Sequence, residues 1–79
     1  MVYVDSAKAP LGRMLMCHMM ATAEEELHAM AAAVGLKRKW FQGDHYDLCQ
    51  TKRAAAVRLG AHEVSSQFLV ELRRQRRQP

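Results

Sequence analysis

The run Asp44-His45-Tyr46-Asp47 places two carboxylates, an imidazole and a phenol within four consecutive residues. Binding and catalytic residues concentrate on loops that a rigid scaffold positions. Carboxylate oxygens and imidazole nitrogens can bind a divalent cation together, or can act as an acid and base pair. We therefore predict a site in which His45 and Asp47 do chemistry, while Asp44 and Tyr46 bind the ligand. The alternative is structural: Asp47 starts a helix, and its neighbours fill polar contacts around a turn.

Asp5 and His18 are the next candidates, because each lies in or beside a predicted strand. Asp5 follows the β-type run Val2–Val4, and His18 interrupts an apolar run between Met14 and Met20. Strands of a parallel sheet carry their sites at their carboxyl ends, so these side chains are expected near the 43–47 loop. Asp5 would act with His45 and Asp47 as a catalytic or metal-binding residue, and His18 would bind the ligand. A hydrogen-bonded core histidine and an aspartate that caps its own turn are the structural alternatives.

Two basic residues indicate an anionic ligand. Arg13 lies in a glycine-containing loop, from which a guanidinium can bind phosphate in bidentate fashion. Lys52 opens a predicted helix, where a positive side chain opposes the helix dipole unless an anion is bound nearby. The ligand would be a nucleotide, a nucleic-acid phosphate or another phosphate ester. If the protein is an enzyme, metal-assisted phosphoester hydrolysis fits best.

The periodicity of apolar residues predicts the elements that must position these groups. We expect strands at 2–4, 14–20, 36–41 and 62–64, with 6–13 as a loop. The first helix is expected from Thr22, with Glu25 completing a capping box, to Gly35. Further helices are expected from Thr51 to Leu59 and from a Ser65 or Ser66 cap onward. Strands that alternate with helices predict a small single α/β domain with a three- to four-stranded, mainly parallel sheet and three helices.

The net charge of +4 is concentrated at one end of the 79-residue chain. The chain divides into a compact domain at 1–72, which has equal numbers of acidic and basic residues, and a basic tail at 73–79. The tail carries Arg73, Arg74, Arg76 and Arg77. It is either a solvated helix end that suits the dipole or a surface for non-specific nucleic-acid binding.

Cysteine usage and hydropathy limit the cellular setting. Cys17 and Cys49 form no Cys-x-x-Cys pair, and with four histidines they do not match a zinc-finger spacing. The chain shows neither a secretory signal pattern nor an apolar run of membrane-spanning length. We expect a cytoplasmic protein with reduced thiols and no membrane contact. Because large core residues are few, we expect either modest stability or additional stabilisation by a homodimer partner.

Several segments together resemble one family of small proteins. They are Val2-Tyr3-Val4-Asp5, Gly12-Arg13-Met14, Cys17-His18-Met19, Glu26-Leu27-His28-Ala29-Met30-Ala31, Trp40-Phe41, His45-Tyr46-Asp47, Lys52-Arg53-Ala54 and Gly60-Ala61. Over roughly residues 2–66 the chain resembles the proteins grouped as domain of unknown function 4031, found in bacteria, phages and prophages. The resemblance implies a phage-type accessory protein and supplies no activity or cofactor. It draws attention to the motif residues, which include His28.

Two functions from different classes remain. The first is a polar His/Asp pocket that binds a phosphate-containing ligand, with or without a metal. The second is a non-catalytic protein that binds a host or phage protein or a nucleic-acid complex, for example to inhibit a host defence, with the arginine tail assisting. Direct nucleic-acid binding by the tail is a third reading.

Overall fold

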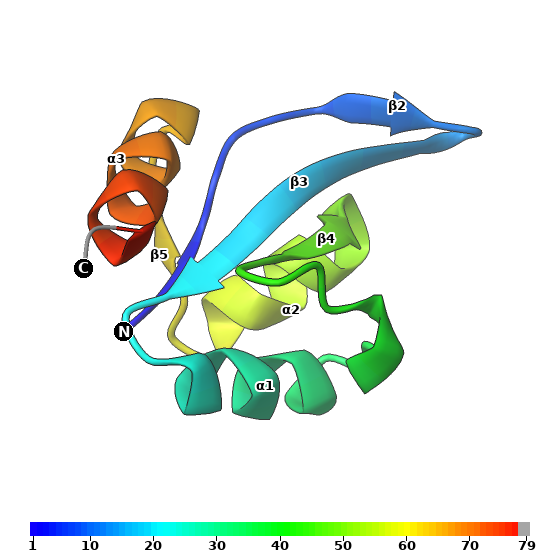
Figure 1. The fold of residues 1–79 in the computed structure, drawn as a ribbon. Coiled ribbons are helices and arrows are strands. Elements are labelled where there is room, and N and C mark those ends of the chain that lie inside the picture. Colours follow the sequence, from blue (N-terminus) through cyan, green and yellow to red (C-terminus); the bar gives the residue numbers. More distant parts are fainter. Residues whose placement is uncertain (78–79) are drawn as a thin grey trace.

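The computed structural model describes residues 1–77, without the side chain of Arg77, and shows an α/β domain (Figure 1). The predicted tail residues 78–79 and the arginine side chain at 77 lie outside this description. The elements are β1 (Val2–Val4), β2 (Ala9–Leu11), β3 (Met14–Ala21), α1 (Glu24–Ala33), a 3-10 turn η1 (Arg38–Trp40), β4 (Tyr46–Cys49), α2 (Gln50–Arg58), β5 (His62–Glu63) and α3 (Ser66–Arg77).

The five-stranded sheet is built around β3. Strands β1 and β2 pair antiparallel with β3, β4 also pairs antiparallel with β3, and β5 pairs parallel with β1. The prediction of an α/β domain with three helices is confirmed, but the prediction of a three- to four-stranded, mainly parallel sheet is wrong. The chain returns along itself at Gly12, whose φ of 60° permits the tight turn between β2 and β3. This hairpin replaces the crossover that a parallel pairing would need.

The two faces of the sheet differ in chemistry because side chains alternate along β3. Cys17, Met19 and Ala21 are buried and join the core cluster that includes Leu27 and Leu48. His18 and Met20 lie on the opposite face, where they share a cavity with residues of α3. In Figure 1, α1 and α2 lie below the sheet and α3 lies on its other side. The polar face is therefore the one that α3 covers.

Three segments were predicted in the wrong conformation. Residues 6–13 are not wholly a loop, because Ala9–Leu11 forms β2 and pairs with β3. Residues 36–41 do not form a strand: Leu36 is buried, and the chain then makes the 3-10 turn η1. Lys37, Arg38 and Lys39 supply no apolar side for a buried strand, so Trp40 stays 44% exposed. Conversely, β4 occupies part of the predicted loop, because Tyr46 and Leu48 alternate with more exposed residues and pair with β3.

Most helix boundaries agree with the sequence analysis, but the start of α1 does not. The N-cap of α1 is Ala23, which makes no side-chain cap bond, so the predicted Thr22 capping box is wrong. Gly35, with φ of 83°, follows the end of α1 as predicted. Ser65 caps α3, since its Oγ accepts a hydrogen bond of 3.1 Å from the Phe68 amide. Helix α3 continues without a break from residue 66 to 77.

Among residues 1–77, no helix has the length and apolar character needed to cross a membrane.

Candidate functional site

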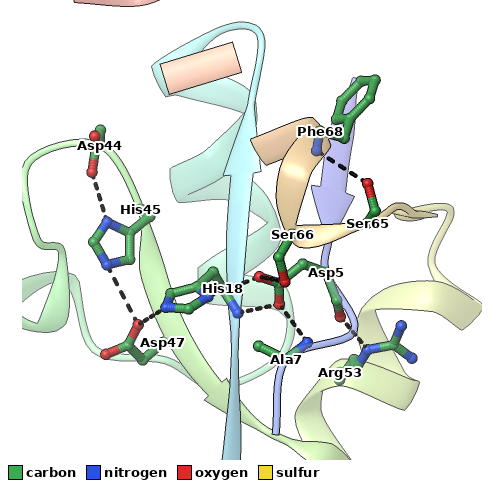
Figure 2. A network of polar contacts seen from close by, with 10 residues as sticks. All are labelled: Asp5, Ala7, His18, Asp44, His45, Asp47, Arg53, Ser65, Ser66 and Phe68. Carbon is green, nitrogen blue, oxygen red and sulfur yellow. Dashed lines mark hydrogen bonds and ion pairs between the residues drawn. The ribbon is translucent and has the colours of Figure 1, made fainter. Parts of the chain in front are cut away.

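Three potential metal ligands, His18, His45 and Asp47, converge on the face of the sheet that α3 covers (Figure 2). We call these residues the His-Asp cluster. One ligand atom from each residue lies within 4.8 Å of the others. The Asp47 Oδ1 atom is 3.4 Å from His45 Nε2 and 3.9 Å from His18 Nε2. The two imidazole rings meet edge to face, with their centroids 5.5 Å apart.

Strand register brings the cluster together. His18 of β3 lies directly opposite Asp47 of β4 in the antiparallel ladder. Residues that oppose one another in this way project from the same face of the sheet. His45 precedes Asp47 by two residues, so the period of the strand places its side chain on that face too.

Each histidine is held by a carboxylate on its far side. His18 Nδ1 is 2.8 Å from Asp5 Oδ2, and His45 Nδ1 is 2.6 Å from Asp44 Oδ1. An ionised carboxylate can only accept, so both Nδ1 atoms donate a proton. In a neutral imidazole the other nitrogen then carries a lone pair. Both Nε2 lone pairs are consequently available to the centre of the cluster.

Asp5 is built into the fold. Its side chain is 1% exposed and accepts hydrogen bonds from the amides of Ala7 (3.2 Å) and His18 (2.9 Å) and from Ser66 Oγ (3.2 Å). Burial by itself would raise the pKa of Asp5. The His18 amide, the His18 ring and the Ala7 amide together outweigh burial and hold the pKa below its ordinary value. Asp5 therefore remains a carboxylate that orients His18.

Asp44 plays the corresponding part for His45. Its second oxygen, Oδ2, accepts a hydrogen bond of 2.5 Å from Arg73 Nε of α3. Burial alone would raise the pKa of Asp44, but the contacts with His45 and Arg73 lower it below its ordinary value. Helix α3 thus contacts both outer carboxylates, Asp5 through Ser66 and Asp44 through Arg73. A cavity of about 150 Å³ lies between α3 and the cluster.

Asp47 carries an unsatisfied oxygen. Its Oδ2 accepts a hydrogen bond of 2.8 Å from Gln42 Nε2, but its buried Oδ1 has no hydrogen-bond partner among the described residues. Buried polar atoms nearly always have a partner, so the exception requires an explanation. Here Oδ1 faces two nitrogen lone pairs, and three acceptors converge with no donor between them. A cation resolves this arrangement, either as a metal ion or as an extra proton on one imidazole.

The geometry fits a metal ion. Ligand atoms placed tetrahedrally at about 2.1 Å from a metal lie roughly 3.4 Å apart. The observed separations of 3.4 and 3.9 Å on Asp47 Oδ1 are close to that value, and all three ligand atoms lie within 4.8 Å of one another. A carboxylate that hydrogen-bonds the far nitrogen of a ligating histidine is a regular outer contact of metal sites. The cluster has this contact at both histidines.

Other predicted site residues lie elsewhere. Tyr46 is buried on the opposite face of the sheet, where its hydroxyl is 2.8 Å from His28 Nδ1. Lys52 Nζ donates to the backbone oxygen of Val34 (2.8 Å), beside the end of α1. Arg13 lies exposed in the β2–β3 turn. It is five residues from His18 along extended chain, a separation of about 16 Å.

Residues that the sequence analysis did not assign to the site also contribute. Ser66 was expected to be a helix cap, and Gln42 was not singled out. Arg73 was assigned to the tail, yet it pairs with Asp44, 29 residues away in the sequence. Ser66 lies 61 residues from Asp5. No local pattern predicts such contacts.

The family model described as "Protein of unknown function (DUF4031)" matches residues 2–76. The chain belongs to this family. Its predicted resemblance is thereby confirmed, and the matched range of the DUF4031 model contains the His-Asp cluster, both outer carboxylates and most of α3. No curated protein and no solved structure matches the chain.

Proposed function

We propose that this protein binds a divalent transition-metal ion between His18, His45 and Asp47 and uses it to hydrolyse a phosphate ester. The observation that carries the proposal is the buried Asp47 Oδ1, which faces two imidazole Nε2 atoms and has no hydrogen-bond donor among the described residues. A carboxylate and two correctly oriented imidazoles form a ligand set for zinc and related ions.

The ligand types favour zinc, cobalt, nickel, manganese or iron over magnesium and calcium. Hard cations prefer a shell made of oxygen ligands, whereas two of the three ligands here are nitrogens. Three protein ligands leave coordination positions for water and substrate. A bound ion supplies a water with a pKa near neutrality and charge stabilisation for phosphoryl oxygens.

Positive charge beside the cluster supports a phosphate-containing ligand. Arg73 lines both the cavity at the cluster and a neighbouring polar hollow of about 330 Å³. Arg76, Gly43 and Asp44 also line this hollow. Asp44 balances one of the two guanidinium groups, so the hollow keeps a net positive charge that suits an anion. Arg73 and Arg76 are two of the arginines that the sequence analysis assigned to the basic tail.

The first experiment is a thermal-unfolding scan of chelator-treated protein with Zn²⁺, Co²⁺, Mn²⁺ or Mg²⁺. An ion at 100 times its dissociation constant stabilises the folded state by about 2.7 kcal/mol. For a domain of this size that corresponds to a rise in Tm of about 10 °C or more. Wild type should respond to the transition metals, and His45→Ala should not respond.

His62→Ala is the matched control, because His62 is exposed on β5 and lies outside the cluster. It should keep the full response to metal. Equal responses of wild type and His45→Ala would refute the metal site and assign the central cation to a proton. For the hydrolytic part, metal-loaded wild type should cleave bis(p-nitrophenyl) phosphate, and His45→Ala should not. Metal binding without cleavage would limit the function to metal-assisted binding.

A phage-type interaction protein is the second candidate function, and the β2–β3 hairpin supports it. Leu11, Met14 and Leu15 expose apolar side chains there, around a turn that projects from the body of the domain (Figure 1). If the hairpin binds a host or phage protein, Leu15→Glu should abolish capture of that partner. His45→Ala should leave capture unchanged.

A further inference from the structure

A groove of about 470 Å³ lies beside the His-Asp cluster, and Asp47 belongs to both. The groove runs between the β2–β3 hairpin, β4 and the segment around η1. Its apolar walls come from Leu11, Met14, Met16, Leu36, Trp40 and Phe41. The volume is in the range of pockets that bind small molecules, roughly 300–1,000 Å³.

Core packing does not account for this groove. Trp40 is 44% exposed and Met14 is 48% exposed, so both keep large apolar surfaces in contact with water. The same opening carries fixed positive charge. Lys39 and Lys52 line it, and Lys52 Nζ is held in place by the Val34 carbonyl at 2.8 Å. An apolar slot with a cationic rim suits a ligand that combines a flat apolar ring with an anionic group.

We propose that the groove binds the base of a nucleotide whose phosphate lies at the His-Asp cluster. This inference rests on the proposed function and specifies its substrate class. Aromatic side chains stack on any base, and methionine sulfur packs well against aromatic rings. Trp40, Phe41, Met14 and Met16 supply both kinds of surface.

Asp47 connects the two parts of this binding site. Its Oδ1 faces the histidines, and its Oδ2 accepts the hydrogen bond from Gln42, which also lines the groove. A ligand in the groove therefore lies next to Asp47, one of the three residues that would hold the metal. The chemistry is the same for a free nucleotide and for one unit of a single strand, so the test includes both.

Trp40 is the single tryptophan of the chain, so its fluorescence reports directly on the groove. Zinc-loaded protein would be titrated with AMP, adenosine, ribose 5-phosphate and a short oligodeoxyadenylate. AMP should quench Trp40 saturably, and adenosine should do so with about tenfold weaker affinity. Ribose 5-phosphate should not quench but should compete with AMP. Tighter binding of the oligonucleotide than of AMP would identify a single strand as the source.

Met14→Ala and Leu15→Ala form a matched pair of variants. The two residues are neighbours on the hairpin with similar exposure, 48% and 42%, but Met14 lines the groove and Leu15 does not. Met14→Ala should weaken AMP binding about fivefold, in line with the loss of one methionine–ring contact. Leu15→Ala should bind AMP like the wild type. Equal affinities for the two variants would overturn the proposal.

The two proposals fail in different ways. If zinc raises the Tm of wild type but no nucleotide or nucleoside quenches Trp40, the groove proposal is overturned and the metal site remains. If AMP and adenosine quench equally, with or without zinc and equally in His45→Ala, the groove binds a base without the cluster. That result would overturn the placement of the phosphate and count against the proposed function.

Discussion

Asp5→Asn should reverse the tautomer of His18 and thereby block metal binding. In the wild type the Asp5 carboxylate accepts a proton from His18 Nδ1 at 2.8 Å, which leaves Nε2 with its lone pair. Asparagine can keep the amide bonds of Ala7 and His18 on its oxygen, at the position of Oδ1. Its NH₂ group would then face Nδ1 and donate to it. The proton of His18 would move to Nε2 and point at Asp47 Oδ1, 3.9 Å away.

The expected size of the effect follows from these contacts. Loss of an outer partner usually lowers metal affinity 10- to 100-fold, and an N–H in place of the ligating lone pair puts this variant at about 100-fold. The Asp5 Oδ2 atom also accepts from Ser66. Replacing these charged contacts by neutral ones should cost the metal-free protein about 2 kcal/mol of unfolding free energy. That loss corresponds to a decrease in Tm of about 10 °C.

The assay is competition with a chromophoric zinc chelator, combined with ¹⁵N NMR of the histidine tautomers. Ser66→Ala is the control, because it removes the hydroxyl contact with Asp5 and leaves the carboxylate in place. It should lose stability but keep metal affinity within a factor of a few. Wild-type zinc affinity in Asp5→Asn, or an Nε2 proton on His18 in the wild type, would refute the reasoning.

Three further predictions concern the fold and its titration. Tyr46→Phe removes the buried hydroxyl 2.8 Å from His28 Nδ1 and should cost about 1–2 kcal/mol in urea unfolding, with zinc affinity unchanged. The pKa values of Asp5 and Asp44 are lowered in the folded state. The unfolded chain therefore binds more protons than the folded protein in acid. The free energy of unfolding of chelator-treated protein should decrease as the pH is lowered through about 4. An unfolding free energy that does not change in this pH range would contradict the prediction. Burial raises the pKa of the Cys17 thiol to about 11, so a disulfide reagent at about pH 8 should leave Cys17 unmodified in the folded protein and label it in guanidinium.

Local sequence was sufficient for much of the secondary structure. Leu27 and Ala31 recur at helical spacing and are buried in α1, and Gly35 and Gly60 follow helix ends with positive φ. Such features depend on near neighbours in the chain, so periodicity and turn chemistry predict them. The 36–41 segment was predicted wrongly because Lys37, Arg38 and Lys39 are three consecutive charged residues, which leave the segment no apolar side to bury. The strand β4 was missed because aspartate and histidine beside it are typical of loops.

The residue types of the candidate site were visible in the sequence, but their arrangement was not. The sequence analysis predicted four site residues at the carboxyl ends of parallel strands: Asp5, His18, His45 and Asp47. His18 and Asp47 instead oppose one another in the antiparallel β3–β4 ladder, while Asp5 directly follows β1 and His45 directly precedes β4. Backbone hydrogen bonds pair strands regardless of side-chain identity, so local sequence does not reveal which strand lies beside β3.

The sequence by itself thus determined which chemical groups the protein has and where most of its helices lie. Tertiary structure decided which groups meet. It placed the lone pairs of His18 and His45 toward Asp47 by fixing a carboxylate behind each ring, and it brought Ser66 and Arg73 of α3 onto those carboxylates. These contacts join residues 29 and 61 positions apart on the α3 side. They form because α3 packs against the sheet, where Leu69 of α3 and Met20 of β3 are both buried around one cavity, and no short stretch of sequence encodes this long-range burial of apolar surface.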